Sequence, residues 1–249
     1  MRTYLHAFAM CQSMFCAIPC PWKIWDEDAR DKMLLALPLV GLEIGLLWAG
    51  LAWAAQELGL PDLIRGILLA AWPYAATGSI HLDGFMDVTD AVGSCRSLER
   101  RREILKDSHV GSFAVIGLCL TVLAQFAFFS AGEGDWRILI FLPAVSRCGS
   151  ALAVTGLKSM STSQYAAQEK PRSRLAVLGA VLASVMAAGW LFCGKYVLVL
   201  AGCLGGYGLA LRKGYRSLEG MNGDIAGYAL TKGELWGACI YGLMAGGIL

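Results

Sequence analysis

Three aspartates with helical spacing stand out in an otherwise apolar sequence. Asp83, Asp87 and Asp90 are spaced i, i+4 and i+7 within the run 78–111, GSIHLDGFMDVTDAVGSCRSLERRREILKDSHVG. At ~100° per residue these side chains fall within ~60° of one another, so on a helix they share one face. Three carboxylates on one face raise one another's pKa unless a cation lies between them. A hard divalent metal ion is the expected partner.

Two further aspartates and several basic residues extend this candidate site. Asp107 ends the basic stretch 96–106, and Asp224 lies in the later run NGDIAG. Mg²⁺ is usually held by a few carboxylates together with substrate phosphates. Arg96 and Lys106 are placed to neutralise phosphate oxygens that the metal does not hold. We therefore predict metal-assisted chemistry on a phosphate ester or anhydride, with Asp83, Asp87 and Asp90 as catalytic residues and the same three aspartates plus Asp107 and Asp224 as metal ligands. Asp90 is our first candidate for the group that takes a proton.

Three other residues are weaker candidates. Glu43 and Arg147 are ionisable residues inside apolar runs, which makes them functional candidates by default, and the two are able to pair with each other. His81 has two interpretations that both stay open. It is a metal ligand or a catalytic base, or it is a histidine whose nitrogens make ordinary polar contacts. The small residues Gly78 and Gly84 predict close helix approach. The sequence contains no GxSxG motif and no glycine-rich P-loop, so we find no indication of covalent catalysis or nucleotide hydrolysis.

The composition indicates the elements that position these residues. The chain of 249 residues is 57% hydrophobic and 16% charged, with a mean hydropathy of +0.56. A soluble protein averages about 45–50% apolar and about 25% charged residues, so this is an integral membrane protein. A net charge of +2 does not suggest nucleic acid as a partner. We predict one membrane domain over residues 1–249, in which 1–21 form an amphipathic or half-inserted helix.

Seven segments are apolar and long enough to be candidate membrane spans. They are 34–55, 63–80, 110–131, 137–157, 175–192, 196–211 and 233–249. The connecting loops alternate in basic residues: 22–32, 81–109, 158–174 and 212–232 carry 16 of the 21 Lys and Arg. The positive-inside rule makes these four loops cytoplasmic. The fold class is therefore all-α, a multi-pass bundle of about seven transmembrane helices in the cell's inner (plasma) membrane.

The alternation has a consequence for the candidate site. The loop 81–109, with its acidic and basic residues and a short amphipathic helix at 96–106, shares the cytoplasmic face with the segment 212–232. The acids of the first segment and Asp224 of the second are able to form one site. Chemistry is therefore expected at the cytoplasmic surface of the lipid bilayer.

The same residues resemble a known family. The run HLDGFMDVTD at 81–90, the pattern RSxxR at 96–100 and the run EILKDSxxGS at 103–112 are similar to the cobalamin synthase family, adenosylcobinamide-GDP ribazoletransferase. Shorter matches are PLVG at 38–41, SR at 146–147 and GDxxG at 223–227. The resemblance covers most of the chain.

The resemblance implies a late step of cobalamin biosynthesis. The ribose hydroxyl of α-ribazole, or of its 5′-phosphate, would attack the cobinamide-side phosphate of adenosylcobinamide-GDP, release GMP and require Mg²⁺. Ser108 and Arg147 then join Arg96 and Lys106 as candidates for binding substrate phosphate. A second copy of the chain or other enzymes of the corrinoid pathway are further candidate partners.

Two alternatives remain open at this stage. The run DVTDAVGSCR at 87–96 loosely resembles the signature of CDP-alcohol phosphotransferases of phospholipid synthesis, but it is one residue longer and its second half does not follow. A cation-coupled transporter would also use carboxylates. Transporters hold their sites near the membrane midplane and carry internal repeats, and this sequence has neither feature.

Overall fold

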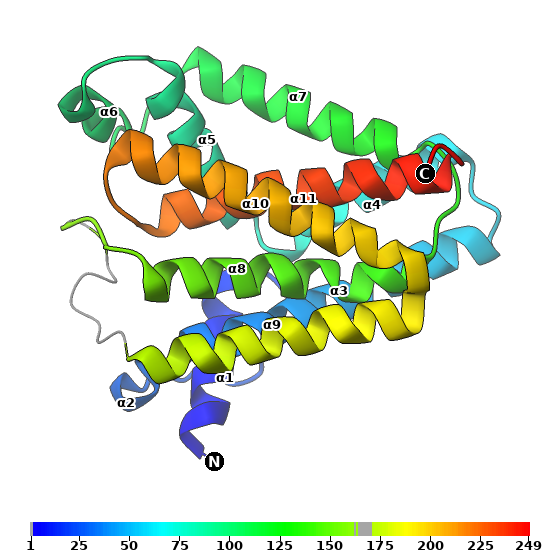
Figure 1. Ribbon diagram of the computed structural model, residues 1–249, viewed down its shortest axis with the longest axis horizontal. Helices are drawn as coiled ribbons and strands as arrows, with labels where there is room; N and C mark the ends of the chain where they lie inside the picture. Colours follow the sequence, from blue (N-terminus) through cyan, green and yellow to red (C-terminus); the bar gives the residue numbers. More distant parts are fainter. Residues whose placement is uncertain (1, 162, 164–170) are drawn as a thin grey trace.

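The chain is built from helices that mostly run along one common direction. The computed structural model describes residues 2–161, 163 and 171–249. Figure 1 shows the long helices side by side. The elements are α1 (Arg2–Phe15), α2 (Glu27–Arg30), α3 (Met33–Glu57), α4 (Asp62–Ala76), α5 (Ile80–Gly93), α6 (Leu98–Ile104), α7 (Ser112–Phe129), η1 (Trp136–Ile140), α8 (Leu142–Gly156), α9 (Arg172–Cys193), η2 (Gly194–Tyr196), α10 (Val197–Leu218) and α11 (Gly223–Ala245). The predicted all-α membrane bundle is confirmed.

Four segments of the described chain are long and apolar enough to cross a membrane. They are Met33–Glu57, Ser112–Phe129, Trp136–Gly156 and Arg172–Leu218. The last of these contains both α9 and α10, which fold back on each other at Gly194, a glycine with φ of +54°. Large apolar side chains such as Leu120, Leu123 and Leu191 are exposed on these helices, as expected for surfaces that face lipid. A total of seven spans stays a prediction.

The loops gather at two opposite ends of the bundle (Figure 1). At one end the α10–α11 loop meets α6 and the loop after α8: Arg102 donates to the carbonyl of Leu218, and the backbones of Met160 and Met221 are joined by a 2.9 Å hydrogen bond. At the other end Arg65 of α4 pairs with Glu133, at 3.4 Å. The first end holds the basic loops and the second holds the loops poor in Lys and Arg. This is the arrangement that the charge alternation predicts.

The N-terminal helix α1 lies against the bundle. It buries Ala7, Met10 and Cys11, and its packing partner is α3. Gln12 donates a 2.8 Å hydrogen bond to Oε1 of Glu43. The pairing of Glu43 with Arg147 that the sequence suggested is therefore wrong, because Glu43 has Gln12 as its partner.

Arg147 pairs instead with a carboxylate of the last helix. Its Nη1 lies 2.9 Å from Oε1 of Glu234, and the two side chains are 1% and 4% exposed. Ser146 also donates to Glu234, at 2.8 Å. Two charges out of water are tolerated best when they are paired and hydrogen-bonded. Here the pairing is through Nη1 of Arg147 alone, while its buried Nε and Nη2 make no hydrogen bond to any described residue. The pair ties α8 to α11 in the interior of the bundle.

Close approach between α5 and α11 depends on two glycines. A Cβ at Gly84 of α5 would lie 2.8 Å from Cα of Asp224, and a Cβ at Gly227 of α11 would lie 2.9 Å from the carbonyl oxygen of His81. The close approach predicted for Gly84 is confirmed. Gly78 does not make such a contact; it has a φ of +57° and belongs to the turn between α4 and α5. Its role is to turn the chain, because this conformation favours glycine.

Candidate functional site

The acidic face of α5 lies at the basic end of the bundle. Asp83, Asp87 and Asp90 all fall within α5, as the i, i+4, i+7 spacing predicts. Asp83 is exposed, whereas Asp87 and Asp90 are partly buried. The opposite face of α5 is anchored in the core by Phe85 and Val88, which are fully buried. The apolar and acidic faces of one short helix therefore fix the carboxylates at the surface of the bundle.

Helix α11 brings a fourth carboxylate to this face. The contact at Gly84 places Asp224 directly beside α5. Asn222 caps α11 by accepting from the backbone N–H of Ile225 at 3.0 Å, and its Nδ2 donates to Oδ2 of Asp224 at 2.6 Å. The run NGDIAG thus begins a helix and orients Asp224 at the same time. Segments 81–109 and 212–232 are therefore in contact through α5 and α11; that they form one functional site stays a prediction.

The electrostatics of these acids call for a cation. The pKa of Asp87 is raised to about 6, first by burial and then by the charges of Asp83, Asp224 and Asp90. Burial also raises the pKa of Asp224. The hydrogen bond from Asn222 lowers this pKa by less, and the negative charge of Asp83 adds a smaller increase. The carboxylates are near enough to repel one another, so a positive charge among them would stabilise their ionised forms.

Two of the predicted metal ligands have other partners. Oδ1 of Asp90 accepts from the N–H of Ala114 in the first turn of α7, at 3.2 Å, and a Cβ at Gly111 would lie 1.9 Å from Oδ2 of Asp90. Asp107 is exposed and its Oδ1 contacts Nδ1 of His109 at 2.6 Å. These contacts lower the pKa of Asp107, the side-chain hydrogen bond from His109 being the largest cause. Within the described chain, no group of three or more His, Cys, Asp or Glu is arranged to hold a metal ion.

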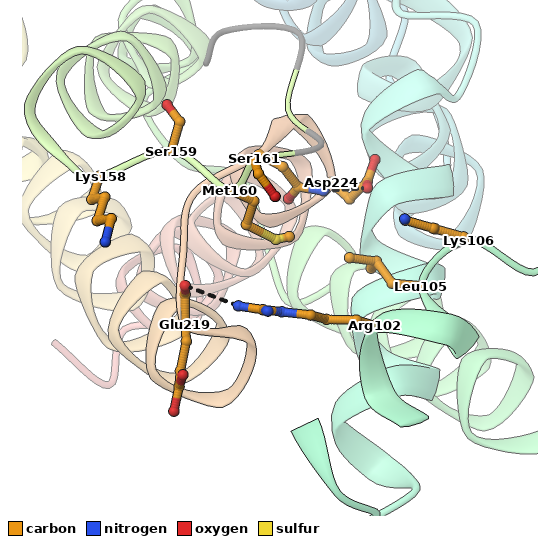
Figure 2. Close-up of a pocket in the computed structure, with 10 residues that line it drawn as sticks. Arg102, Leu105, Lys106, Lys158, Ser159, Met160, Ser161, Glu219 and Asp224 are labelled. Atoms are coloured by element: carbon orange, nitrogen blue, oxygen red, sulfur yellow. Dashed lines mark hydrogen bonds between the residues drawn. The ribbon is translucent and has the colours of Figure 1, made fainter. Parts of the chain in front are cut away.

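A polar cavity of about 540 Å³ opens beside Asp224 (Figure 2). Figure 2 shows Arg102 and Lys106 reaching into it from the side of α6, with Lys158 on the opposite wall. The lining residues are Arg102, Leu105, Lys106, Lys158, Ser159, Met160, Ser161, Glu219, Asn222 and Asp224. Three cations around one cavity, next to a carboxylate, form an environment suited to a phosphate-bearing ligand. Its volume is within the ~300–1,000 Å³ range of small-molecule sites.

Arg102 holds one wall of this polar cavity in place. Its Nε and Nη2 donate to the carbonyl of Leu218 at 3.1 and 2.9 Å, and Nη2 also donates to the carbonyl of Glu219 at 3.2 Å. These carbonyls end α10, where backbone acceptors lack partners within the helix. Glu219 has a φ of +53°, a backbone conformation that residues other than glycine rarely adopt. The fork of Arg102 therefore fixes the turn that leads into Asn222.

A second, smaller cavity of about 160 Å³ is also lined by Asp224. Its walls come from α1, α3, α5, α8 and α11. The lining residues are Phe15, Leu34, Leu37, Ile80, His81, Asp83, Gly84, Ser150, Val154, Gly223, Asp224, Ala226 and Gly227. Most of these are apolar or glycine. Asp224 lines both cavities, so the two meet at Asp224; Asp83 lines the smaller cavity only, and Asp87 and Asp90 line neither.

The candidate phosphate-binding residues are not all at this place. Lys106 lines the polar cavity, whereas Arg96 and Ser108 are exposed and line neither cavity. Arg147 is buried with Glu234. Sequence reasoning missed Arg102, which looks no different from its neighbours in the basic run at 100–102. It also missed Lys158, whose one signal was its place in a basic loop on the predicted cytoplasmic side.

Comparison with known proteins places this chain in a family. A helical membrane bundle with carboxylates beside a cationic cavity is the arrangement expected of a membrane enzyme that acts on phosphate compounds. The sequence model of the family described as cobalamin-5-phosphate synthase matches residues 7–242. The chain therefore belongs to the cobalamin-5-phosphate synthase family.

The relatives agree with this assignment. A protein named adenosylcobinamide-GDP ribazoletransferase from Clostridium perfringens (strain SM101 / Type A) is 35% identical over 252 residues, which cover 98% of this chain and all of the relative. Proteins of the same name from Clostridium botulinum (strain Alaska E43 / Type E3) and Geotalea daltonii are 30% and 33% identical, over 97% and 92% of this chain and 100% and 92% of their own lengths. No solved structure matches the chain. The resemblance to the cobalamin synthase family is confirmed, and with it the prediction of a transferase of cobalamin synthesis in preference to the two alternatives.

Proposed function

We propose that this enzyme joins adenosylcobinamide-GDP to α-ribazole, or to α-ribazole 5′-phosphate, and releases GMP. The names of the relatives supply the substrate that carries GDP. The observation that carries the proposal is the position of Asp224 beside the acids of α5, at the edge of a cavity lined by Arg102, Lys106 and Lys158. Such a site is able to hold a diphosphate and a hydroxyl nucleophile together.

In the proposed reaction one bond replaces another at a single phosphorus atom. The ribose hydroxyl oxygen bonds to the phosphorus on the cobinamide side of the diphosphate. The bond from that phosphorus to the bridging oxygen breaks, and the bridging oxygen leaves with GMP. Arg102, Lys106 and Lys158 would bind the phosphate oxygens and stabilise the charge that develops on the leaving group. The hydroxyl proton passes to a carboxylate of the site.

Asp87 suits the role of proton acceptor better than Asp90. Sequence reasoning favoured Asp90, but Oδ1 of Asp90 accepts from the backbone of α7. Asp87 is partly buried beside Asp83 and Asp224, and its carboxylate makes no hydrogen bond to any described residue. A carboxylate without another partner is available to accept the hydroxyl proton. We therefore assign proton transfer to Asp87 and the positioning of α7 to Asp90.

The residues present fit Mg²⁺ that is shared with substrate. The donors on α5 and α11 are carboxylate oxygens, the ligands that Mg²⁺ prefers, and Mg²⁺ commonly takes only one or two carboxylates together with substrate phosphates and water. The lack of a three-residue cage among the described residues agrees with that mode. Asp83 and Asp224 would hold the ion, with Asp87 next to them. When bound, Mg²⁺ supplies Lewis-acid activation of the phosphorus and charge neutralisation.

We also propose that this site faces the cytoplasm from the inner (plasma) membrane. The support is the gathering of the basic loops at the end of the bundle that holds the site. Single cysteines in place of Ser94 and Glu133 test it, in a background from which the reactive native cysteines are removed. A membrane-impermeant thiol reagent should label Glu133→Cys from outside intact cells and Ser94→Cys only after the cells are opened. Labelling of both positions from outside would overturn the proposed orientation.

The reaction is tested with the purified protein in lipid. Adenosylcobinamide-GDP and Mg²⁺ are supplied with either α-ribazole or its 5′-phosphate, and GMP and the corrinoid product are measured. We expect one GMP for each corrinoid product, and the ratio of kcat/KM values identifies the preferred acceptor. Folded protein that forms no GMP with either acceptor would refute the proposal.

A further inference from the structure

The two cavities that meet at Asp224 differ in their chemistry. Arg102, Lys106 and Lys158 line the larger one, whereas the residues that line the smaller one include no Lys or Arg. Leu34, Leu37 and Val154 supply apolar walls to the smaller cavity. A multiply charged diphosphate would lose its hydration there without gaining a cation, which is unfavourable. A neutral ligand would not have this penalty.

Two aromatic side chains belong to the wall of the smaller cavity. The His81 ring lies 6.1 Å from the ring of Phe15, centroid to centroid, at an interplanar angle of 27°. Nδ1 of His81 is buried and makes no hydrogen bond to any described residue, so it is not open to a ligand in the cavity. A flat aromatic ligand would pack favourably against these two rings.

The size of the cavity limits the ligand further. A volume of about 160 Å³ corresponds to about five water molecules of liquid, at ~30 Å³ each. This is room for a bicyclic aromatic ring and far too little for a corrin macrocycle. The surface-exposed Asp83 and Gly223 line the cavity too, so it reaches the surface where the acids lie.

From these observations we infer that the smaller cavity is the subsite for the neutral aromatic base of the acceptor nucleoside, with the rings of Phe15 and His81 against that base. The inference rests on the proposed function and assigns its two substrates to different cavities. The polar cavity takes the guanosine diphosphate end of the corrinoid substrate. The ribose of the acceptor then lies at the shared wall, where Asp83 and Asp224 place its hydroxyl beside the diphosphate. Acceptor specificity is thus set by the walls of the smaller cavity.

The test uses Ala226→Leu, which adds a larger side chain to the wall of the smaller cavity. The matched control is Ala187→Leu, the same change at an exposed position of α9. Binding of α-ribazole to the protein in lipid is measured by titration calorimetry, without the second substrate. We expect Ala226→Leu to weaken this binding by at least tenfold and Ala187→Leu to leave it unchanged. Equal affinity in both variants would overturn the inference.

A second variant, His81→Ala, removes one of the two rings at the wall of the smaller cavity. Loss of one aromatic contact should raise the KM for α-ribazole about fivefold, with the KM for adenosylcobinamide-GDP unchanged. A KM for α-ribazole that stays at the wild-type value, or an equal rise in both KM values, would refute the assignment. The binding titration needs no turnover. If α-ribazole binds the wild type and not Ala226→Leu, the subsite is supported even where no GMP is released and the proposed reaction fails.

Discussion

Replacing Gly84 with alanine should disturb catalysis more than folding. The added Cβ would lie 2.8 Å from Cα of Asp224 and 3.1 Å from its carbonyl oxygen. Both are backbone atoms, so no side chain is able to move away. Restoring an ordinary contact of 3.4 Å requires α5 and α11 to separate by about 0.6 Å at this point. The acids of α5 and Asp224 would move apart by a similar amount.

The size of the effect follows from this displacement. Overpacking costs about 1–3 kcal/mol, while alanine gains about 1 kcal/mol over glycine in a helix, so the net loss of stability should be about 0–2 kcal/mol. A 1 Å misplacement of reacting groups lowers the rate by about 100-fold, so 0.6 Å should lower kcat on the order of tenfold.

The matched control for this variant is Gly50→Ala in α3. A Cβ at Gly50 would have no atom within 4 Å, so we expect wild-type turnover and unchanged or higher stability. Initial rates of GMP release and thermal unfolding in lipid are measured for both variants. If Gly84→Ala keeps the wild-type kcat, the contact does not position the carboxylates and the reasoning fails.

Further substitutions test three other parts of the structure. Because burial and neighbouring acids raise the pKa of Asp87 from 3.8 to about 6, the folded state binds the proton more tightly, and stability should fall as the pH rises through about 4 to 6. Asp87→Asn should remove this fall. In the absence of Mg²⁺ it should also raise the free energy of unfolding at pH 7 by about 1 kcal/mol, because solvent screening reduces the ~3 kcal/mol that corresponds to the full pKa shift. Thermal unfolding of the variant with the wild-type pH dependence would contradict this. Arg102→Met should raise the KM for adenosylcobinamide-GDP about tenfold, since it removes a cation and releases the turn at Glu219. An unchanged KM would argue against binding of the diphosphate in the polar cavity. Glu234→Ala should destabilise the protein by about 3–5 kcal/mol in thermal unfolding, because it leaves Arg147 buried without its partner. The double change Arg147→Met with Glu234→Leu should recover much of that loss. No recovery would show that the two side chains act separately.

The sequence was sufficient for the parts of the structure that depend on local patterns. The spacing of Asp83, Asp87 and Asp90 predicted their common face because helical geometry relates such positions directly. The alternation of basic loops predicted that Asp224 would lie at the same end of the bundle as α5. The short helix expected within 96–106 is present as α6, which Ser97 caps by accepting from the N–H of Arg100.

The contacts between helices were beyond local patterns. Two carboxylates in apolar surroundings, Glu43 and Glu234, were available to Arg147, and only the packing of α8 against α11 selects Glu234. The arginines at 100–102 are alike in sequence, and the rotation of α6 decides that Arg102 reaches the end of α10. Asp90 carries the same carboxylate as Asp87, but the start of α7 meets Asp90 and gives it a different partner.

We propose above all that the carboxylates of α5 and α11 carry out transfer to the corrinoid diphosphate. The most direct measurement is GMP release from adenosylcobinamide-GDP and acceptor by the wild type and by Asp224→Asn, at a series of Mg²⁺ concentrations in lipid. We predict that the wild type releases GMP only with Mg²⁺ and acceptor present, and that Asp224→Asn, folded to the same extent, is slower by at least about 100-fold. Equal rates in the two proteins, or GMP release that does not depend on Mg²⁺, would contradict it.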